Sequence, residues 1–160
     1  MKYIDDLRVG DVLMTGRHTF NADEIKAFAR RFDPQPFHLD EEAAARSHFG
    51  ALCASGWQTA AVWMRLLIDY RRAEADAMIA RGEPVAVNGP ALGFRDLKWQ
   101  KPVYVGDVVD YKTVLTEVRF SNSRPGYGLM TTLTTGVNQS GVTVISFIST
   151  NFVERRPASA

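Results

Sequence analysis

The most apolar segment of the chain reads Gly56-Trp57-Gln58-Thr59-Ala60-Ala61-Val62-Trp63-Met64-Arg65-Leu66-Leu67-Ile68-Asp69-Tyr70. Its apolar side chains cover nearly the whole circumference of a helix. The polar ones keep to a narrow line at Gln58, Arg65 and Asp69, and the last two are spaced to pair as i and i+4. A helix that is apolar almost all round is buried, so we expect residues 56–70 to form the central helix of the fold.

The residues that follow this helix have the pattern of strands. Turn-forming clusters at 121–126 and 139–141 separate long runs rich in β-branched and aromatic residues, which indicates hairpins and therefore an antiparallel sheet. Several runs exceed the usual strand length of about 5–6 residues, as expected of strands that curl around a central helix. The expected strands are 92–94, 97–99, 107–120, 127–138 and 142–153. We therefore predict a single α+β domain over residues 1–154, with a disordered tail at 155–160.

Two helices are expected before the central one. Asn21 and Glu24 have the spacing of a capping box, and the helix that they begin should end at Asp33, which precedes a proline. Asp40 is the expected cap of a second short helix that ends before Gly50.

Residues 69–87 look like an additional helical excursion that carries three arginines, Arg71, Arg72 and Arg81. These arginines could line a pocket or hold the phosphates of coenzyme A. The alternative is a solvated helix face.

Composition excludes several classes of function. The chain has 19 basic and 18 acidic residues without a run of like charge, so neither nucleic-acid binding nor a polybasic membrane patch is predicted. The first residues lack the pattern of a signal peptide, and no apolar stretch is long enough to cross a bilayer. The only cysteine, Cys53, cannot form an intrachain disulfide and is interpreted as a small buried hydrophobe. We expect a cytoplasmic protein.

The segment Asp33-Pro34-Gln35-Pro36-Phe37-His38 carries the candidate chemistry. Two prolines stiffen the chain between a carboxylate and an imidazole, which suits groups that must converge on one water molecule. Histidine exchanges protons near neutral pH, and a carboxylate beside it can act as a base. The alternative is that Asp33 only ends a helix and His38 is a structural loop residue. His18 and His48 lack such neighbours and are expected at the surface.

Ala54-Ser55-Gly56 leads into the central helix, where backbone N–H groups lack intrahelical partners. Such a helix terminus favours developing negative charge, and Gly56 lets a substrate carbonyl approach closely. Hydration of an enoyl thioester moves charge onto the thioester oxygen, which an N–H donor would stabilise. The alternative is that Ser55 only caps the helix.

These motifs resemble the MaoC-like dehydratase family, relatives of the R-specific enoyl-CoA hydratases, which have the hot dog fold. The family's hydratase motif, roughly Asp-x-Asn-Pro-x-His, reads here Asp33 to His38, with Gln35 in place of the asparagine. The family's step into the central helix reads Ala54-Ser55-Gly56-Trp57, with Ser55 in place of a histidine. Weaker similarity at 97–107 and 137–141 extends the resemblance over roughly residues 7–153.

The resemblance implies a lyase of fatty acyl metabolism that reversibly hydrates a 2-enoyl-CoA to a 3-hydroxyacyl-CoA. Asp33 and His38 would be the acid–base pair, and the Gly56 N–H would bind the thioester oxygen. Of the neighbouring residues, we expect Ser55, Trp57 and Gln35 to contact the substrate. No metal and no cofactor are expected, and the partners are an acyl-CoA thioester and a second copy of the chain in a homodimer.

Two other functions remain open from the sequence. One is an acyl-CoA thioesterase, because the same fold hosts thioester hydrolysis. A hydrolase of this kind needs a carboxylate or an activated water on the central helix, which offers Gln58 and Thr59 but no acid before Asp69. The other is a non-catalytic domain that binds acyl-CoA.

Overall fold

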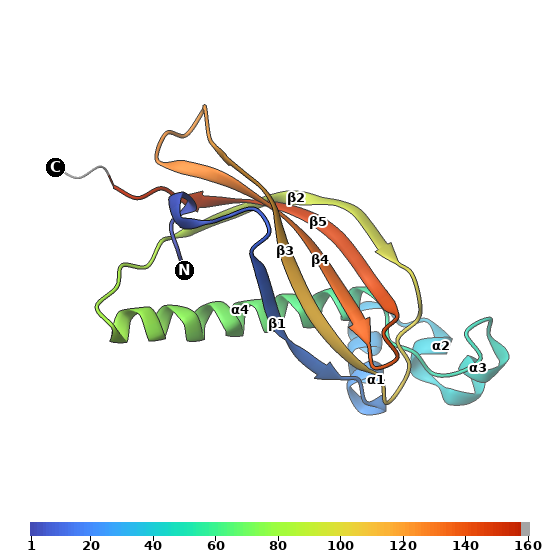
Figure 1. The fold of residues 1–160 in the computed structure, drawn as a ribbon. Coiled ribbons are helices and arrows are strands. Elements are labelled where there is room, and N and C mark those ends of the chain that lie inside the picture. The colour runs from blue at the N-terminus through green and yellow to red at the C-terminus, as the bar shows by residue number, and fades with distance from the viewer. Residues whose placement is uncertain (158–160) are drawn as a thin grey trace.

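The computed structural model describes residues 1–157, which form one curved antiparallel sheet and a long helix that lies along it (Figure 1). The strand order is β1-β3-β4-β5-β2, and every neighbouring pair is antiparallel. The long hairpin strands β3, β4 and β5 lie in the middle, so β1 and β2 are the two edges. The strands are β1 (Val12–Thr19), β2 (Asn88–Trp99), β3 (Val108–Phe120), β4 (Tyr127–Asn138) and β5 (Thr143–Glu154).

Five helical segments complete the fold of residues 1–157. A 3-10 turn precedes β1, three short helices follow it, and one helix of 25 residues precedes β2. They are η1 (Ile4–Asp6), α1 (Ala22–Phe32), α2 (Pro36–Leu39), α3 (Glu41–Arg46) and α4 (Gly56–Ala80). The α+β hot dog architecture that the sequence predicts, a curved sheet around a central helix, is confirmed.

The central helix α4 is longer than expected and less completely buried. It continues ten residues past Tyr70, so residues 69–80 extend the helix and are not a separate excursion. Arg65 and Asp69 form the expected ion pair at 2.7 Å. The prediction that the helix is buried all round is wrong for one face, because Trp57 is 59% exposed and Ile68 is 42% exposed.

The opposite face of α4 packs into the concave side of the sheet. Trp63 and Leu67 are each 4% exposed and lie in one cluster with Tyr111, Ile145 and Phe147 of the sheet. The Tyr111 hydroxyl donates to the Thr59 carbonyl oxygen of α4 at 3.0 Å. The helix is therefore held against the sheet by apolar packing and by a buried hydrogen bond.

Helices α1, α2 and α3 gather at the N-terminal end of α4 (Figure 1). Both caps predicted there are confirmed: Asn21 and Glu24 form the capping box of α1, and Asp40 Oδ1 accepts from Ala43 N at 2.8 Å to begin α3. The one-turn helix α2 begins with a proline at its first position, where a missing N–H has no cost. This arrangement brings α2 next to the start of α4.

Of the tail predicted at residues 155–160, the structure describes residues 155–157. Residues 158–160 are not described. Arg156 donates to the Asp5 and Asp6 carboxylates at 2.9 and 2.7 Å. No helix of the described residues is both long and apolar enough to span a membrane.

Candidate active site

His38 is fixed by its surroundings in one orientation. Its side chain, carried by α2, is only 6% exposed, and Nδ1 lies 2.7 Å from the carbonyl oxygen of Cys53. Since a carbonyl oxygen can only accept, Nδ1 carries the proton of this contact. The other ring nitrogen, Nε2, is therefore left to act on a substrate or a water molecule.

Asp33 lies on the free side of that imidazole. Its Oδ2 is 3.5 Å from His38 Nε2, and its Oδ1 accepts a hydrogen bond of 2.8 Å from Gln35 Nε2. The residue also ends α1, because its own N–H donates to the Ala29 carbonyl oxygen at 2.9 Å. Asp33 thus terminates a helix, as expected, and also lies close to His38, while its role as an acid or base stays a prediction.

The environment of Asp33 favours its charged form. Burial is the largest single influence and raises the pKa of Asp33, but the polar side chains of Ser55 and Gln35, together with His38, outweigh it. The net result is a pKa below the ordinary aspartate value. Asp33 is consequently a carboxylate over the whole neutral range, as a proton acceptor must be.

Gly56 presents a free backbone N–H at the start of α4. Within residues 1–157 this N–H donates to no acceptor, whereas the next N–H, of Trp57, donates to Ser55 Oγ at 3.2 Å. A Cβ atom at position 56 would lie 2.7 Å from the Trp99 indole, so only glycine fits beside this ring. The site therefore offers a backbone donor in a place where a side chain cannot cover it.

The residues predicted to contact substrate have other partners in the structure. Gln35 supports Asp33, while Ser55 caps α4 and favours the Asp33 charge. Trp57 projects from α4 and packs edge-on against Trp99, with ring centroids 5.1 Å apart. Substrate contact by these three residues stays a prediction.

Sequence reasoning missed Trp99 as part of this site. It lies at the end of β2, and its indole Nε1 donates to the Gly56 carbonyl oxygen at 2.8 Å. The Cys53 carbonyl oxygen, which orients His38, was missed as well.

The Cys53 side chain behaves as predicted, since it is 1% exposed and burial raises the pKa of its thiol to about 11. A thiol of that pKa is protonated at neutral pH and is no nucleophile.

The other histidines are placed as follows. His48 is exposed, as predicted, and stacks on Phe49. His18, also expected at the surface, is half-buried, and its Nε2 lies 2.7 Å from Glu24 Oε1, a carboxylate neighbour that was not expected from the sequence. Among residues 1–157 no three metal-ligating side chains are grouped to hold an ion.

Comparison with known proteins gives consistent matches. The family model described as MaoC like domain matches residues 8–137. The solved structure of a MaoC-like dehydratase from Rhodospirillum rubrum is 38% identical, covers 99% of this chain and 100% of that chain, and superposes with a TM-score of 0.80.

Two curated relatives extend the comparison. The uncharacterised protein YdeM of Bacillus subtilis is 31% identical over 141 residues, which are 88% of this chain and 91% of YdeM. The 3-hydroxybutyryl-CoA dehydratase of Methylorubrum extorquens is 27% identical over 116 residues, 72% of this chain and 65% of that protein. On the family match and the overall structural agreement, this chain belongs to the MaoC-like dehydratase family.

Proposed function

We propose that this protein reversibly adds water to the double bond of a 2-enoyl-CoA and so forms a 3-hydroxyacyl-CoA. The observation that supports the proposal most is the pairing of a charged Asp33 with a His38 ring whose Nδ1 is held by a backbone carbonyl. One carboxylate oxygen and one imidazole nitrogen face each other, at a separation that lets both contact the same water molecule.

The reaction follows from these two groups and one backbone donor. The pair binds water and removes one of its protons while the oxygen bonds to carbon 3 of the enoyl group. Negative charge moves through carbon 2 to the thioester oxygen, where the Gly56 N–H is the donor that stabilises it. The pair then returns the proton to carbon 2, so the elements of water are added and both residues regain their starting states.

The thioesterase alternative finds less support. Thioester hydrolysis needs a nucleophile or an activated water aimed at the carbonyl carbon. On the first turns of α4, Thr59 Oγ1 already donates to the Gly56 carbonyl oxygen at 2.6 Å, and Gln58 is an amide without acid–base function. Asp69, the first acid of α4, pairs with Arg65.

The test is a product analysis with crotonyl-CoA. We expect the absorbance of the conjugated thioester to fall without release of free thiol, and 3-hydroxybutyryl-CoA to accumulate. Free coenzyme A as the product would identify a thioesterase. Binding of crotonyl-CoA without turnover, repeated with longer enoyl-CoAs, would identify a non-catalytic domain.

We further propose that the enzyme is a cytoplasmic homodimer joined through β2. This strand is a sheet edge that pairs only with β5 among the described residues, and two of its apolar side chains, Leu92 and Phe94, are 58% and 52% exposed. An open apolar edge is stabilised when another strand pairs with it. Because Trp99 at the end of β2 touches Gly56, a dimer of this kind would place both active sites near the interface.

A further inference from the structure

A cavity of about 440 Å³ lies between the middle of α4 and the concave face of the sheet. This volume is in the range of small-molecule sites. Its lining includes neither Asp33 nor His38 nor Gly56, so it lies beyond the candidate active site. Along α4 it extends from Trp63 to Glu74, about 16 Å at the helical rise of 1.5 Å per residue.

The walls of the cavity are both apolar and polar. The apolar part comes from Trp63, Leu67 and Phe94 and from Leu115 and Met130 of the sheet. Such a surface favours an extended apolar group. It makes an aliphatic chain a suitable occupant.

The hydroxyl groups on the sheet side are satisfied within the protein. Thr132 Oγ1 and Ser149 Oγ lie 3.1 Å apart, and Thr113 Oγ1 lies 2.9 Å from Thr134 Oγ1. These groups need no ligand.

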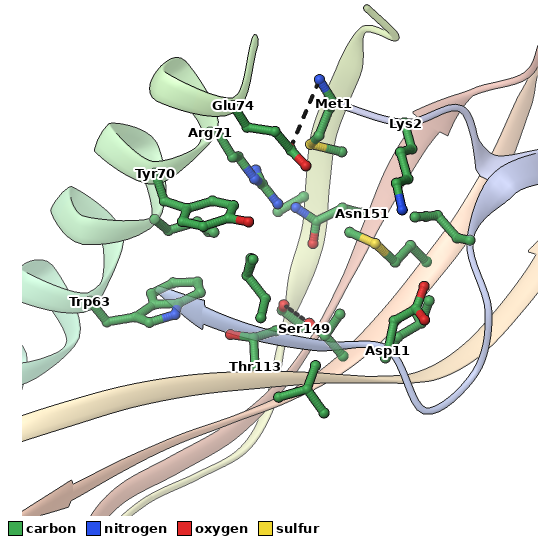
Figure 2. Close-up of a pocket in the computed structure, with 18 of the residues that line it drawn as sticks. Met1, Lys2, Asp11, Trp63, Tyr70, Arg71, Glu74, Thr113, Ser149 and Asn151 are labelled. Atoms are coloured by element: carbon green, nitrogen blue, oxygen red, sulfur yellow. Dashed lines mark hydrogen bonds and ion pairs between the residues drawn. The ribbon is translucent and has the colours of Figure 1, made fainter. Parts of the chain in front are cut away.

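The donors on the α4 side are not satisfied. Figure 2 shows Trp63, Tyr70 and Arg71 extending from α4 into the cavity. The Trp63 Nε1 atom is buried without a hydrogen-bond partner, and within residues 1–157 neither Tyr70 nor Arg71 has a side-chain hydrogen bond or an ion pair. Trp63 Nε1 is a buried donor without a partner, which costs free energy, while Tyr70 and Arg71 are half-buried donors, so a ligand that brings acceptor oxygens would be stabilised here.

Arg71 is the strongest of these donors. Burial lowers the pKa of Arg71 and outweighs the opposite influence of the nearby Glu74 carboxylate. Glu74 itself forms its ion pair with the N-terminal amine at 4.0 Å, and the remaining charged groups of the lining, Lys2 and Asp11, are of opposite sign. Lys2 is a second positive charge of the lining, but Arg71 is the group that offers a ligand carboxylate the fork geometry of a guanidinium.

We propose that this cavity binds an aliphatic chain that ends in a carboxylate, with the carboxylate on Arg71 and the chain along Trp63, Leu67 and Phe94. Two kinds of ligand carry a chain that ends in a carboxylate. One is a free medium-chain carboxylic acid. The other is the distal end of a dicarboxylic acyl thioester whose reacting end lies at Gly56, since Gly56, Trp63 and Arg71 follow one another along the same helix. The second source rests on the proposed hydratase function.

The first arm of the test is calorimetric titration with decanoate and with decanol, which has the same chain and no charge. Decanoate is expected to bind at least about tenfold more tightly than decanol to the wild type, as a charge-assisted hydrogen bond implies. Arg71→Gln should lose this preference, and Arg71→Lys should keep part of it. Arg72→Gln, at the exposed neighbouring arginine, is the matched control and should bind as the wild type does.

The second arm compares two enoyl-CoA substrates, one with a carboxylate and one with a methyl group at the far end of the chain. If decanoate does not bind, the cavity can still hold the far end of a thioester substrate. The wild type and Arg72→Gln should then have a higher kcat/KM for the carboxylate-ended substrate than for the methyl-ended one, and Arg71→Gln should lose this preference. Crotonyl-CoA turnover should stay unchanged in Arg72→Gln. A wild type that hydrates neither crotonyl-CoA nor longer enoyl-CoAs would contradict the proposed function and leave the decanoate result unaffected. The proposal is overturned if Arg71→Gln alters neither decanoate binding nor substrate preference while its thermal unfolding matches that of Arg72→Gln.

Discussion

The indole of Trp99 lies against the backbone of Gly56 and donates its Nε1–H to the Gly56 carbonyl oxygen at 2.8 Å. The two residues are 43 positions apart, and the contact joins the edge strand β2 to the first residue of α4. It fixes the Gly56–Trp57 peptide, which adjoins the peptide whose N–H is free. The position of the proposed oxyanion donor thus depends on a side chain of the sheet.

Replacing Gly56 with alanine should remove activity without unfolding the protein. The added Cβ would lie 2.7 Å from the Trp99 ring, so either the ring or the start of α4 must shift. A displacement of about 1 Å at a reacting centre can reduce a rate roughly a hundredfold, and we expect a loss of kcat/KM of that order. Gly126→Ala is the control, because nothing lies within 4 Å of a Cβ there. Equal activity of both variants would show that Gly56 is not at the site.

The side chain of Gln35 should lower the pKa of Asp33. It donates to Asp33 Oδ1 at 2.8 Å, and this bond is one of the influences that outweigh burial. In Gln35→Ala we expect the pKa of Asp33 to rise, as measured by NMR titration of the carboxyl carbon with Asp33→Asn for assignment. An unchanged pKa would mean that Ser55 and His38 are sufficient.

The same pKa has a consequence for stability. Because the folded pKa of Asp33 lies below its unfolded value, the charged form contributes stability that is fully present above the unfolded pKa of about 3.9. This contribution is lost as the pH falls through the lower folded pKa. In Gln35→Ala it should be smaller, so the difference in the free energy of unfolding between wild type and variant should narrow in acid. A constant difference across the acid range would contradict this linkage.

Tyr111 should stabilise the packing of α4 on the sheet. Its fully buried hydroxyl donates to the Thr59 carbonyl oxygen at 3.0 Å. Tyr111→Phe removes this second hydrogen bond from a carbonyl that also accepts within α4, and the loss of one hydrogen bond typically costs about 0.5–1.5 kcal/mol of unfolding free energy. Urea denaturation measures this loss, and Tyr127→Phe, whose hydroxyl has no hydrogen bond among the described residues, should leave the stability nearly unchanged. A similar stability for both variants would contradict the assigned role of the bond.

The β2 edge should determine the oligomeric state. Leu92→Lys places a charge on the exposed apolar edge, and we expect the protein to sediment as a 17.8 kDa monomer instead of a dimer. Val9→Lys changes a comparably exposed apolar residue outside the sheet and should leave the dimer intact. A wild type that is monomeric at micromolar concentration would contradict the proposed homodimer.

Local signals in the sequence predicted the elements that build the site. The capping residues at Asn21 and Asp40, the proline that follows Asp33 and the apolar helix beginning at Gly56 are all detectable within a few residues. The pairing of Asp33 with His38 could be inferred because both lie in one short stiff segment.

Other features depend on contacts that the sequence pattern does not contain. α2 is a single turn, too short to show a helical period. The second half of α4 was separated from the first because charged residues interrupt its apolar pattern after Asp69, although the helix ends only at Ala80, just before Gly82 with φ +70°. The contact of Trp99 with Gly56 depends on the pairing of β2 with β5, which has three irregularities in register.

The central claim is that Asp33 and His38 together carry out hydration. The most direct test measures kcat for crotonyl-CoA hydration in Asp33→Asn and His38→Ala beside two controls, Asp23→Asn and His48→Ala, which change exposed residues of the same types. We predict that kcat falls by about a hundredfold or more in each site variant and stays at the wild-type value in both controls. Undiminished turnover in Asp33→Asn or in His38→Ala, with the protein folded, would contradict the account.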